Sequence, residues 1–321
     1  MTSIKRGRLF GACLTATLAS VIGASGLRAE PGDRQQVPLF SAGVDLVRVN
    51  AVVRDRKGRF VQELTARDFQ VLDEGVARPI VDFRREAGAI SAALLLDISG
   101  SMEGRMRDAR EAATHVLSSL DVARDEAAIF TFDTRLDEVQ PFAKGVQTLP
   151  DSLSAVTPFG ATSLHDAIAR TAERLAAREG LRRAVIVFTD GNDNASRLTP
   201  EEVSGIASAI DVPVYIVGIV AAIDNPASDI SVVKVENSAL AGALTNLATW
   251  TGGRVAIAST SADRSMLARE IVGELRHQYF ITFESSGRPG WHPLAVRARG
   301  KDLTVRARSG YIAGQSRPSP Q

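Results

Sequence analysis

The chain has 321 residues, of which 45% are hydrophobic and 23% are charged, and its formal net charge is +1. This composition is that of a globular protein with one sizeable core and a smaller module, and it excludes a disordered or fibrous chain. No block of like charge stands out, so the composition indicates neither a nucleic-acid partner nor a membrane-surface patch.

The first 29 residues predict a signal peptide. Three basic residues in MTSIKRGR precede an apolar stretch that ends in small residues, and we expect cleavage near Ala29. A transmembrane anchor is the alternative, but the apolar stretch is only around the minimum length for a span. We therefore expect an exported protein, periplasmic, at the cell surface or secreted, with no membrane insertion after cleavage. The single cysteine, Cys13, lies in the removed segment, so the mature chain would contain no disulfide.

Residues 43–88, after a predicted linker over 30–42, show a β pattern. Alternation in VDLVRVNAVVRD predicts one strand, and FQVLDEG and RPIVDFRR predict two shorter ones. The pattern returns over 277–313 in YFITFE, HPLAVRARG and DLTVRARSGYI, before a loose tail over 314–321. Each segment alone would expose unpaired strand edges. We therefore expect the two to pair into one small β-sandwich-like module.

Residues 89–276 alternate apolar strands with amphipathic helices. The expected strands are SAALLLD, EAAIFTFD, RRAVIVFTD and VPVYIVGIV. Strands that are apolar throughout indicate an α/β fold, a doubly wound and mostly parallel sheet with helices on both faces. One helix should begin at TPEEV, where Thr199 and Glu202 can form a capping box. The other expected helices cover 102–120, 164–175, 238–250 and 262–276.

Polar side chains follow the first of these strands, in LLLDISGSMEG. Alternate side chains of an extended segment point the same way, so Asp97, Ser99 and Ser101 should converge where the strand ends. Ligands of doubly wound folds bind at this edge. Thr162 in FGATSL and Asp190 in FTDGND lie in loops of the same edge. Carboxylate and hydroxyl oxygens suit a hard cation, chiefly Mg²⁺, with Mn²⁺ or Ca²⁺ as alternatives.

With these residues, the chain resembles the von Willebrand factor A domain family over about 91–276. The family's metal-ion-dependent adhesion site combines D-x-S-x-S with a Thr and an Asp from two later loops. The resemblance implies that Ser99 and Ser101 bind the metal directly, Thr162 directly or through water, and Asp97 and Asp190 mostly through water. The flanking β segments resemble an exported bacterial subfamily that places this domain between β segments.

Simpler interpretations of several residues remain open. Ser and Asp at strand ends also cap helices, and Ser101 could start the helix that follows it. Asp193 and Asn194 are expected to be turn residues. The histidines show no zinc spacing. We expect the four histidines to be surface or packed residues: His115, His165, His277 and His292. We expect the two tryptophans, Trp250 and Trp291, to be packing residues.

Motifs of common enzyme classes are missing from the sequence. There is no G-x-x-x-x-G-K-[ST], H-E-x-x-H or G-x-S-x-G. Ser231 and Lys234 match S-x-x-K, but they lie in a predicted loop without an S-D-N or K-T-G partner. We therefore expect a binding protein rather than an enzyme. Its metal would bind an Asp or Glu carboxylate of a protein partner. The alternative is a structural or assembly component of an envelope complex, with a metal that only stabilises the loops.

The stretch AAIDNPASDISVVKVEN, after VPVYIVGIV, is longer than the two to six residues usual for such a connection. Because its strand should run parallel to those carrying Asp97 and Asp190, we expect this loop to border the metal and contact the partner. A disordered insertion is the alternative. The two β segments are expected on the side of the domain opposite the metal.

Overall fold

The computed structural model describes most of the chain after the predicted linker, and all of the described residues belong to one compact unit. The predicted signal peptide, linker and tail lie outside the described residues, as does the long loop with its S-x-x-K sequence. No helix in the described part is long and apolar enough to cross a membrane. The described ranges are 46–85, 88–178, 182–209, 211–220 and 242–313.

A six-stranded sheet forms the centre of the α/β part, in the order β10–β9–β8–β5–β6–β7. All neighbouring strands run parallel except β7, which pairs antiparallel with β6 at one edge. The order reverses at β5, because the chain continues to β6 on one side of it and later to β8 on the other. The strands are β5 (Ile90–Asp97), β6 (Glu126–Phe132), β7 (Leu136–Lys144), β8 (Arg182–Thr189), β9 (Val214–Ile219) and β10 (Arg254–Ala258).

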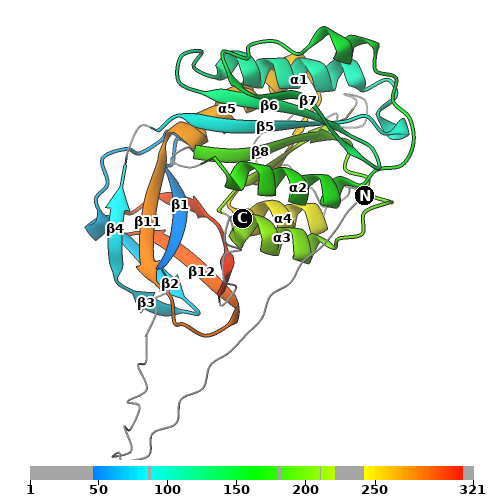
Figure 1. The fold of residues 1–321 in the computed structure, drawn as a ribbon. Coiled ribbons are helices and arrows are strands. Elements are labelled where there is room, and N and C mark those ends of the chain that lie inside the picture. The colour runs from blue at the N-terminus through cyan, green and yellow to red at the C-terminus, as the bar shows by residue number, and fades with distance from the viewer. Residues whose placement is uncertain (1–45, 86–87, 179–181, 210, 221–241, 314–321) are drawn as a thin grey trace, which may run out of the picture. The chain divides into compact units, whose positions relative to one another are not determined.

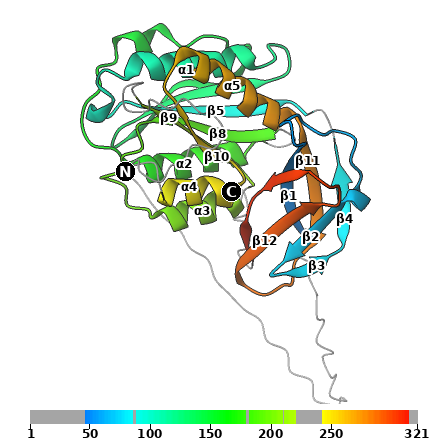
Figure 2. The ribbon, with the colours of Figure 1, turned by 180° about the vertical axis from the view of Figure 1, so that it is seen from behind.

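Helices cover both faces of this sheet, with α1 and α5 on one face and α2, α3 and α4 on the other (Figures 1 and 2). Consecutive residues of β5, Leu94 and Leu95, are fully buried in the two separate cores. This is the doubly wound, mostly parallel α/β fold that the sequence predicts. The helices are α1 (Met106–Ser119), α2 (Leu164–Ala176), α3 (Pro200–Ala209), α4 (Ala243–Thr251) and α5 (Ser261–Arg276).

Several elements differ from the sequence-based expectation. The patterns do not predict β7 or β10, and the helix expected from residue 102 begins only at Met106. Residues Gly100–Met102 instead form a 3-10 turn. The capping box of TPEEV is confirmed: the backbone N–H of Thr199 donates to Glu202 Oε2 (2.8 Å), and that of Glu202 donates to Thr199 Oγ1 (3.2 Å).

The two flanking β segments pair with each other, as expected. One four-stranded sheet has the order β13–β1–β11–β4 and the other β14–β12–β2–β3, so both combine strands from the two ends of the chain. The stretch DLTVRARSGYI contains two strands, β13 and β14, which belong to different sheets. The strands are β1 (Leu46–Arg54), β2 (Phe69–Asp73), β3 (Val76–Arg78), β4 (Ile80–Arg84), β11 (Gln278–Glu284), β12 (Gly290–Ala298), β13 (Thr304–Ala307) and β14 (Gly310–Ala313).

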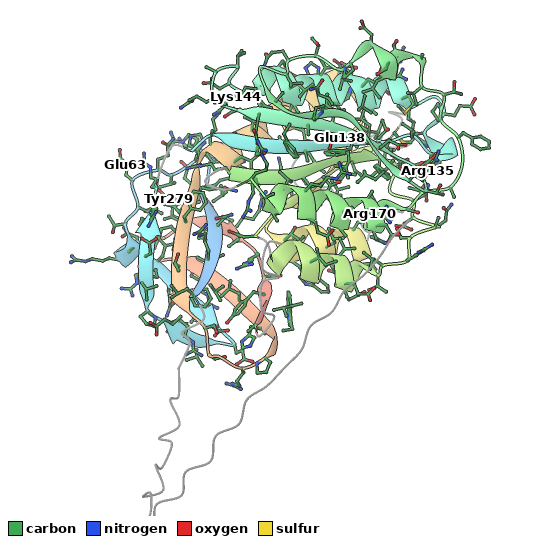
Figure 3. All side chains as sticks on the ribbon, in the orientation of Figure 1. Glu63, Arg135, Glu138, Lys144, Arg170 and Tyr279 are labelled. Carbon is green, nitrogen blue, oxygen red and sulfur yellow. The ribbon has the colours of Figure 1, made fainter. Side chains whose placement is uncertain are left out.

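These two sheets form a sandwich around a core of their own. Val49 and Ile281 from one sheet and Val71 and Leu294 from the other are buried in a single cluster. Tyr279, labelled in Figure 3, packs against the ring of Phe69 at 5.2 Å between centroids and links the two sheets. Burial of apolar side chains between two sheets gives the module a core that neither segment has alone.

The sandwich contacts the amino ends of the parallel strands. Glu274 near the end of α5 is fully buried and accepts hydrogen bonds from Arg54 of β1 (3.0 Å) and Arg306 of β13 (2.7 and 2.8 Å). The guanidinium of Arg182, the first residue of β8, lies over the ring of Phe280 in β11. Because Asp97 ends its strand, the sandwich joins the edge opposite the predicted metal site.

Candidate metal centre

The sheet brings the two predicted carboxylates to one edge. Asp97 is the last residue of β5, and Asp190 directly follows β8. These strands pair in parallel up to Leu96 opposite Phe188, so their carboxyl ends lie next to each other. This position is where the strand order reverses, the place at which doubly wound folds bind ligands.

Asp97 is completely buried, and both of its carboxylate oxygens accept hydrogen bonds. Oδ1 accepts from the backbone N–H of Ser99 (2.9 Å) and Oδ2 from Thr189 Oγ1 (2.6 Å). Burial raises the pKa of Asp97, the hydrogen bonds from Ser99 and Thr189 oppose this, and the nearby charge of Asp190 raises the pKa further. A cation at this edge would favour the charged carboxylate.

The two serines lie together beside this carboxylate. Ser99 Oγ and Ser101 Oγ are 3.2 Å apart; Ser99 is buried and Ser101 is exposed. The helix-capping interpretation is not supported, because Ser99 precedes the 3-10 turn without a side-chain cap bond and α1 begins after Arg105. The serine hydroxyls therefore have no capping role at this edge.

Thr162 belongs to a loop that is hydrogen-bonded to the loops on both sides of it. Its backbone N–H donates to Asn194 Oδ1 (2.9 Å), and its carbonyl accepts from the backbone N–H of Asn194 (3.1 Å). Asn194 lies in the loop that contains Asp190. Gly160 O accepts from the N–H of Gly100 (3.0 Å), which lies between Ser99 and Ser101. Three loops that are distant in sequence are thus joined around the predicted ligands, and Thr162 itself is buried.

Sequence reasoning misses two residues that contact the predicted ligands. Arg105 Nη1 donates to the carbonyl of Ser101 (2.7 Å) and lies 3.3 Å from Asp190 Oδ2. Thr189 orients Asp97, as described above. Arg105 follows Ser101 by four residues, but no motif marks an arginine there, and the contact with Asp190 depends on the folded sheet.

Asp193 and Asn194 hold the loop together, as expected of turn residues. Asp193 accepts hydrogen bonds from the backbone N–H groups of His165 (2.9 Å) and Ser196 (3.1 Å). Burial alone would raise the pKa of Asp193. The hydrogen bonds from His165 and Ser196 together outweigh burial, so the pKa of Asp193 is lowered. Asp193 therefore remains ionised and fixes the start of α2 to the loop that follows Asp190.

The histidines and tryptophans are packed or paired rather than gathered at one site. His292 is buried and stacks on Tyr311, with ring centroids 4.9 Å apart. His277 stacks on Phe60 at 4.5 Å. The other residues of this set also have partners: His115 lies by Glu111, His165 by Asp193, and Trp250 packs against the partly exposed Trp291.

The donors at this edge fit a small hard cation. They are hydroxyl and carboxylate oxygens, which Mg²⁺, Mn²⁺ and Ca²⁺ prefer. Within the described residues no group of three or more His, Cys, Asp and Glu side chains could hold a metal ion. A metal here would therefore depend on the hydroxyls of Ser99, Ser101 and Thr162 as well as on the two aspartates.

Two basic side chains lie near this edge. The side chain of Arg105 is 34% exposed. Arg135 is exposed in the turn before β7, and Figure 3 shows it and Lys144 at opposite ends of that strand. The same turn is tied to the Thr162 loop, because the carbonyl of Asp133 accepts from the N–H of Ser163 (2.7 Å). Both arginines lie beside acids, Arg105 next to Asp190 and Arg135 in the same turn as Asp133, so the edge carries charges of both signs.

Comparison with known proteins identifies one matching domain family. The model of the von Willebrand factor type A domain family matches residues 92–192, a range that includes all five predicted ligands. No curated protein sequence matches the chain. Structures with a similar fold have low identity, and three of them are described next.

An aerotolerance-related membrane protein from Bacteroides fragilis is 17% identical, with 58% of this chain and 98% of that chain covered and a TM-score of 0.46. A von Willebrand factor type A protein from Catenulispora acidiphila is 13% identical, with 85% and 75% covered and a TM-score of 0.45. Proximal thread matrix protein 1 from the mussel byssus, whose metal-ion-dependent adhesion site holds zinc, is 17% identical, with 63% and 49% covered and a TM-score of 0.44. The family match shows that residues 92–192 belong to a von Willebrand factor type A domain.

Proposed function

We propose that this protein is an exported, adhesion-type binding protein that uses a divalent cation to hold a protein partner, and that it is not an enzyme. The cation, chiefly Mg²⁺, would bind at the carboxyl edge of the sheet and take an Asp or Glu carboxylate of the partner. The observation that carries the proposal is the gathering of hydroxyl and carboxylate groups there, with the two serine hydroxyls 3.2 Å apart. No nucleic acid or membrane is needed as a partner.

The chemistry of the donors supports an acidic partner. Both oxygens of Asp97 already accept hydrogen bonds within the protein, so Asp97 suits contact with a metal through water. A metal held mainly by neutral hydroxyls keeps more of its positive charge for an incoming carboxylate. The exposed Arg135 at the same edge could pair with an acidic group of the partner.

A metal that only stabilises the loops, as in a structural or assembly component, is the alternative. Direct hydrogen bonds already join these loops, including those from Gly100 to Gly160 (3.0 Å) and from Phe159 to Ile98 (2.9 Å). Such bonds between backbone groups need no metal. Recognition of a partner is therefore the better supported role.

The two roles differ under chelation. Immobilised mature protein would be incubated with envelope extract in Mg²⁺ and then in EDTA, and its unfolding temperature measured in both. We expect the proteins captured in Mg²⁺ to be lost in EDTA, and the same proteins to be missing with the Ser99→Ala variant. The unfolding temperature of the immobilised protein should change little. Ser118→Ala, an exposed serine on α1, is the matched control and should retain them. Capture that persists in EDTA would contradict the proposal, and a large fall in unfolding temperature would favour the stabilising role.

A further inference from the structure

Phe159 is an exposed aromatic side chain at the metal edge. It is 82% exposed, the highest value among the large hydrophobic side chains that the structure describes. A single exposed apolar side chain is ordinary on a protein surface, so exposure alone indicates no function. The position and the anchoring of Phe159 distinguish it from the others.

The backbone of Phe159 is tied to the loop that carries the serines. Its N–H donates to the carbonyl of Ile98 (2.9 Å), and the carbonyl of Gly160 accepts from Gly100 (3.0 Å). Gly160 has a φ of +84°, a conformation that favours glycine. These bonds hold the base of the ring next to the segment between Asp97 and Ser101, and three residues before Thr162.

We propose that Phe159 is a specificity contact, which packs against an apolar side chain next to the acidic residue of the partner. This inference rests on the proposed function. The partially exposed guanidinium of Arg105 contacts the carbonyl of Ser101 (2.7 Å) and Asp190. With the proposed cation bound, the edge would combine positive charge with one exposed apolar ring on an anchored backbone. The segment that fits it is a peptide with an Asp or Glu close in sequence to an aliphatic or aromatic residue.

Phe159 supplies the selectivity that a metal cannot. A bound cation accepts any accessible carboxylate, and exposed acidic residues are common on proteins. An aromatic ring that becomes buried on binding separates acids with an apolar neighbour from acids without one. Contacts of this kind are typical of the few residues that dominate interface affinity. We expect loss of the ring to weaken binding about tenfold, which corresponds to about 1.4 kcal/mol.

Selection from a random peptide display library tests this directly. The library would be bound in Mg²⁺ and eluted with EDTA, with the wild type, Phe159→Ser and the matched control Val122→Ser. Val122 is 57% exposed and precedes β6, at the amino edge of the sheet. For the wild type and the control we expect peptides in which an acidic residue has an apolar neighbour. For Phe159→Ser we expect the acidic residue to stay enriched and the apolar neighbour to be lost.

The outcomes separate this inference from the function on which it rests. Enrichment of acids without an apolar neighbour in the wild type would overturn the role of Phe159, as would an apolar preference that Phe159→Ser retains. Absence of acid enrichment with all three proteins would overturn the proposed function itself, and this inference with it. An enriched peptide should bind Phe159→Ser about tenfold more weakly than the wild type by calorimetry, while Mg²⁺ binds both equally.

Discussion

At the scale of single residues, Asp97 depends on neighbours that the motif does not contain. The D-x-S-x-S spacing predicts that Asp97, Ser99 and Ser101 converge as alternate residues of an extended segment. Ser101 lies instead in the 3-10 turn Gly100–Met102, and that turn leaves its hydroxyl 3.2 Å from the hydroxyl of Ser99. The bond from Thr189 to Asp97 requires β5 and β8 to be neighbours, with Leu96 opposite Phe188. Local spacing therefore predicts the ligands, but only the sheet register reveals what orients them.

The two aspartates should be essential for metal binding and dispensable for folding. Asp97→Ala and Asp190→Ala each remove a carboxylate, and we expect Mg²⁺ and Mn²⁺ binding to be lost in calorimetry while the circular dichroism spectrum stays native. Their removal also relieves repulsion between two nearby like charges, so stability without metal should not fall steeply. Asp137→Ala, at an exposed position of β7, is the control and should bind metal normally. Unchanged metal affinity in either site variant would exclude these residues as the metal site.

Arg105 should compete with the metal for Asp190. Its guanidinium lies 3.3 Å from Asp190 Oδ2, and its side chain is one-third exposed, so the ion pair is worth up to about 1 kcal/mol. We therefore expect Arg105→Met to raise Mg²⁺ affinity about two- to fivefold in a calorimetric titration. Arg107→Met, two residues later in the first turn of α1, is the matched control, because its side chain is 91% exposed. Weaker metal binding by Arg105→Met alone would mean that Arg105 supports the site.

At the scale of elements, burial explains which parts of the fold the sequence predicts. Strands β5, β6 and β9 are buried along their whole length, and β8 at every position except Arg183, so they appear as mostly apolar runs. β7 lies at the edge, and its polar sequence LDEVQPFAK gives no such signal. Met102 is fully buried although it lies in a 3-10 turn, so its apolar character extends the helical pattern of α1 beyond the helix.

The stability of the protein should depend on pH through Glu126, which links β5, β6 and the residues that follow α2. Glu126 accepts hydrogen bonds from Ser91 Oγ (2.6 Å) and Arg178 Nε (2.7 Å). Burial raises the pKa of Glu126, but the hydrogen bonds and charge of Arg178 and the bond from Ser91 outweigh it, so the pKa is lowered overall. The contribution of ionised Glu126 to the free energy of unfolding is therefore present above the pKa that Glu126 has in the unfolded chain. It is lost as the pH falls through the lower pKa that Glu126 has in the folded protein.

Urea unfolding between neutral and acidic pH, in EDTA, measures this contribution. We expect Glu126→Gln to lower the free energy of unfolding at neutral pH by about 1 kcal/mol, since Arg178 is partly exposed, and to lose less stability than the wild type on acidification. Glu201→Gln, at an exposed position in the first turn of α3, should follow the wild-type curve. Equal acid dependence in Glu126→Gln and the wild type would assign the acid sensitivity to other groups.

At the scale of the whole molecule, Glu274 joins the sandwich to the α/β part. Its partners Arg54 and Arg306 come from β1 and β13, and Arg254 of β10 lies 3.8 Å away. The sequence predicts that the two β segments pair, because each would leave unpaired strands. It does not reveal this junction, because Arg54 and Glu274 are 220 residues apart and no local pattern links them.

Glu274→Gln should therefore destabilise the protein without affecting the metal site. The substitution leaves three arginine side chains around a fully buried neutral group, and loss of one partner of a buried ion pair costs about 3 kcal/mol or more. We expect the free energy of unfolding in urea to fall by about this amount, while calorimetric Mg²⁺ affinity at the opposite edge stays at the wild-type value. Glu284→Gln, at the exposed end of β11, controls for the loss of one charge. Reduced Mg²⁺ affinity in Glu274→Gln, with the protein still folded, would show instead that the sandwich junction and the metal edge are energetically coupled.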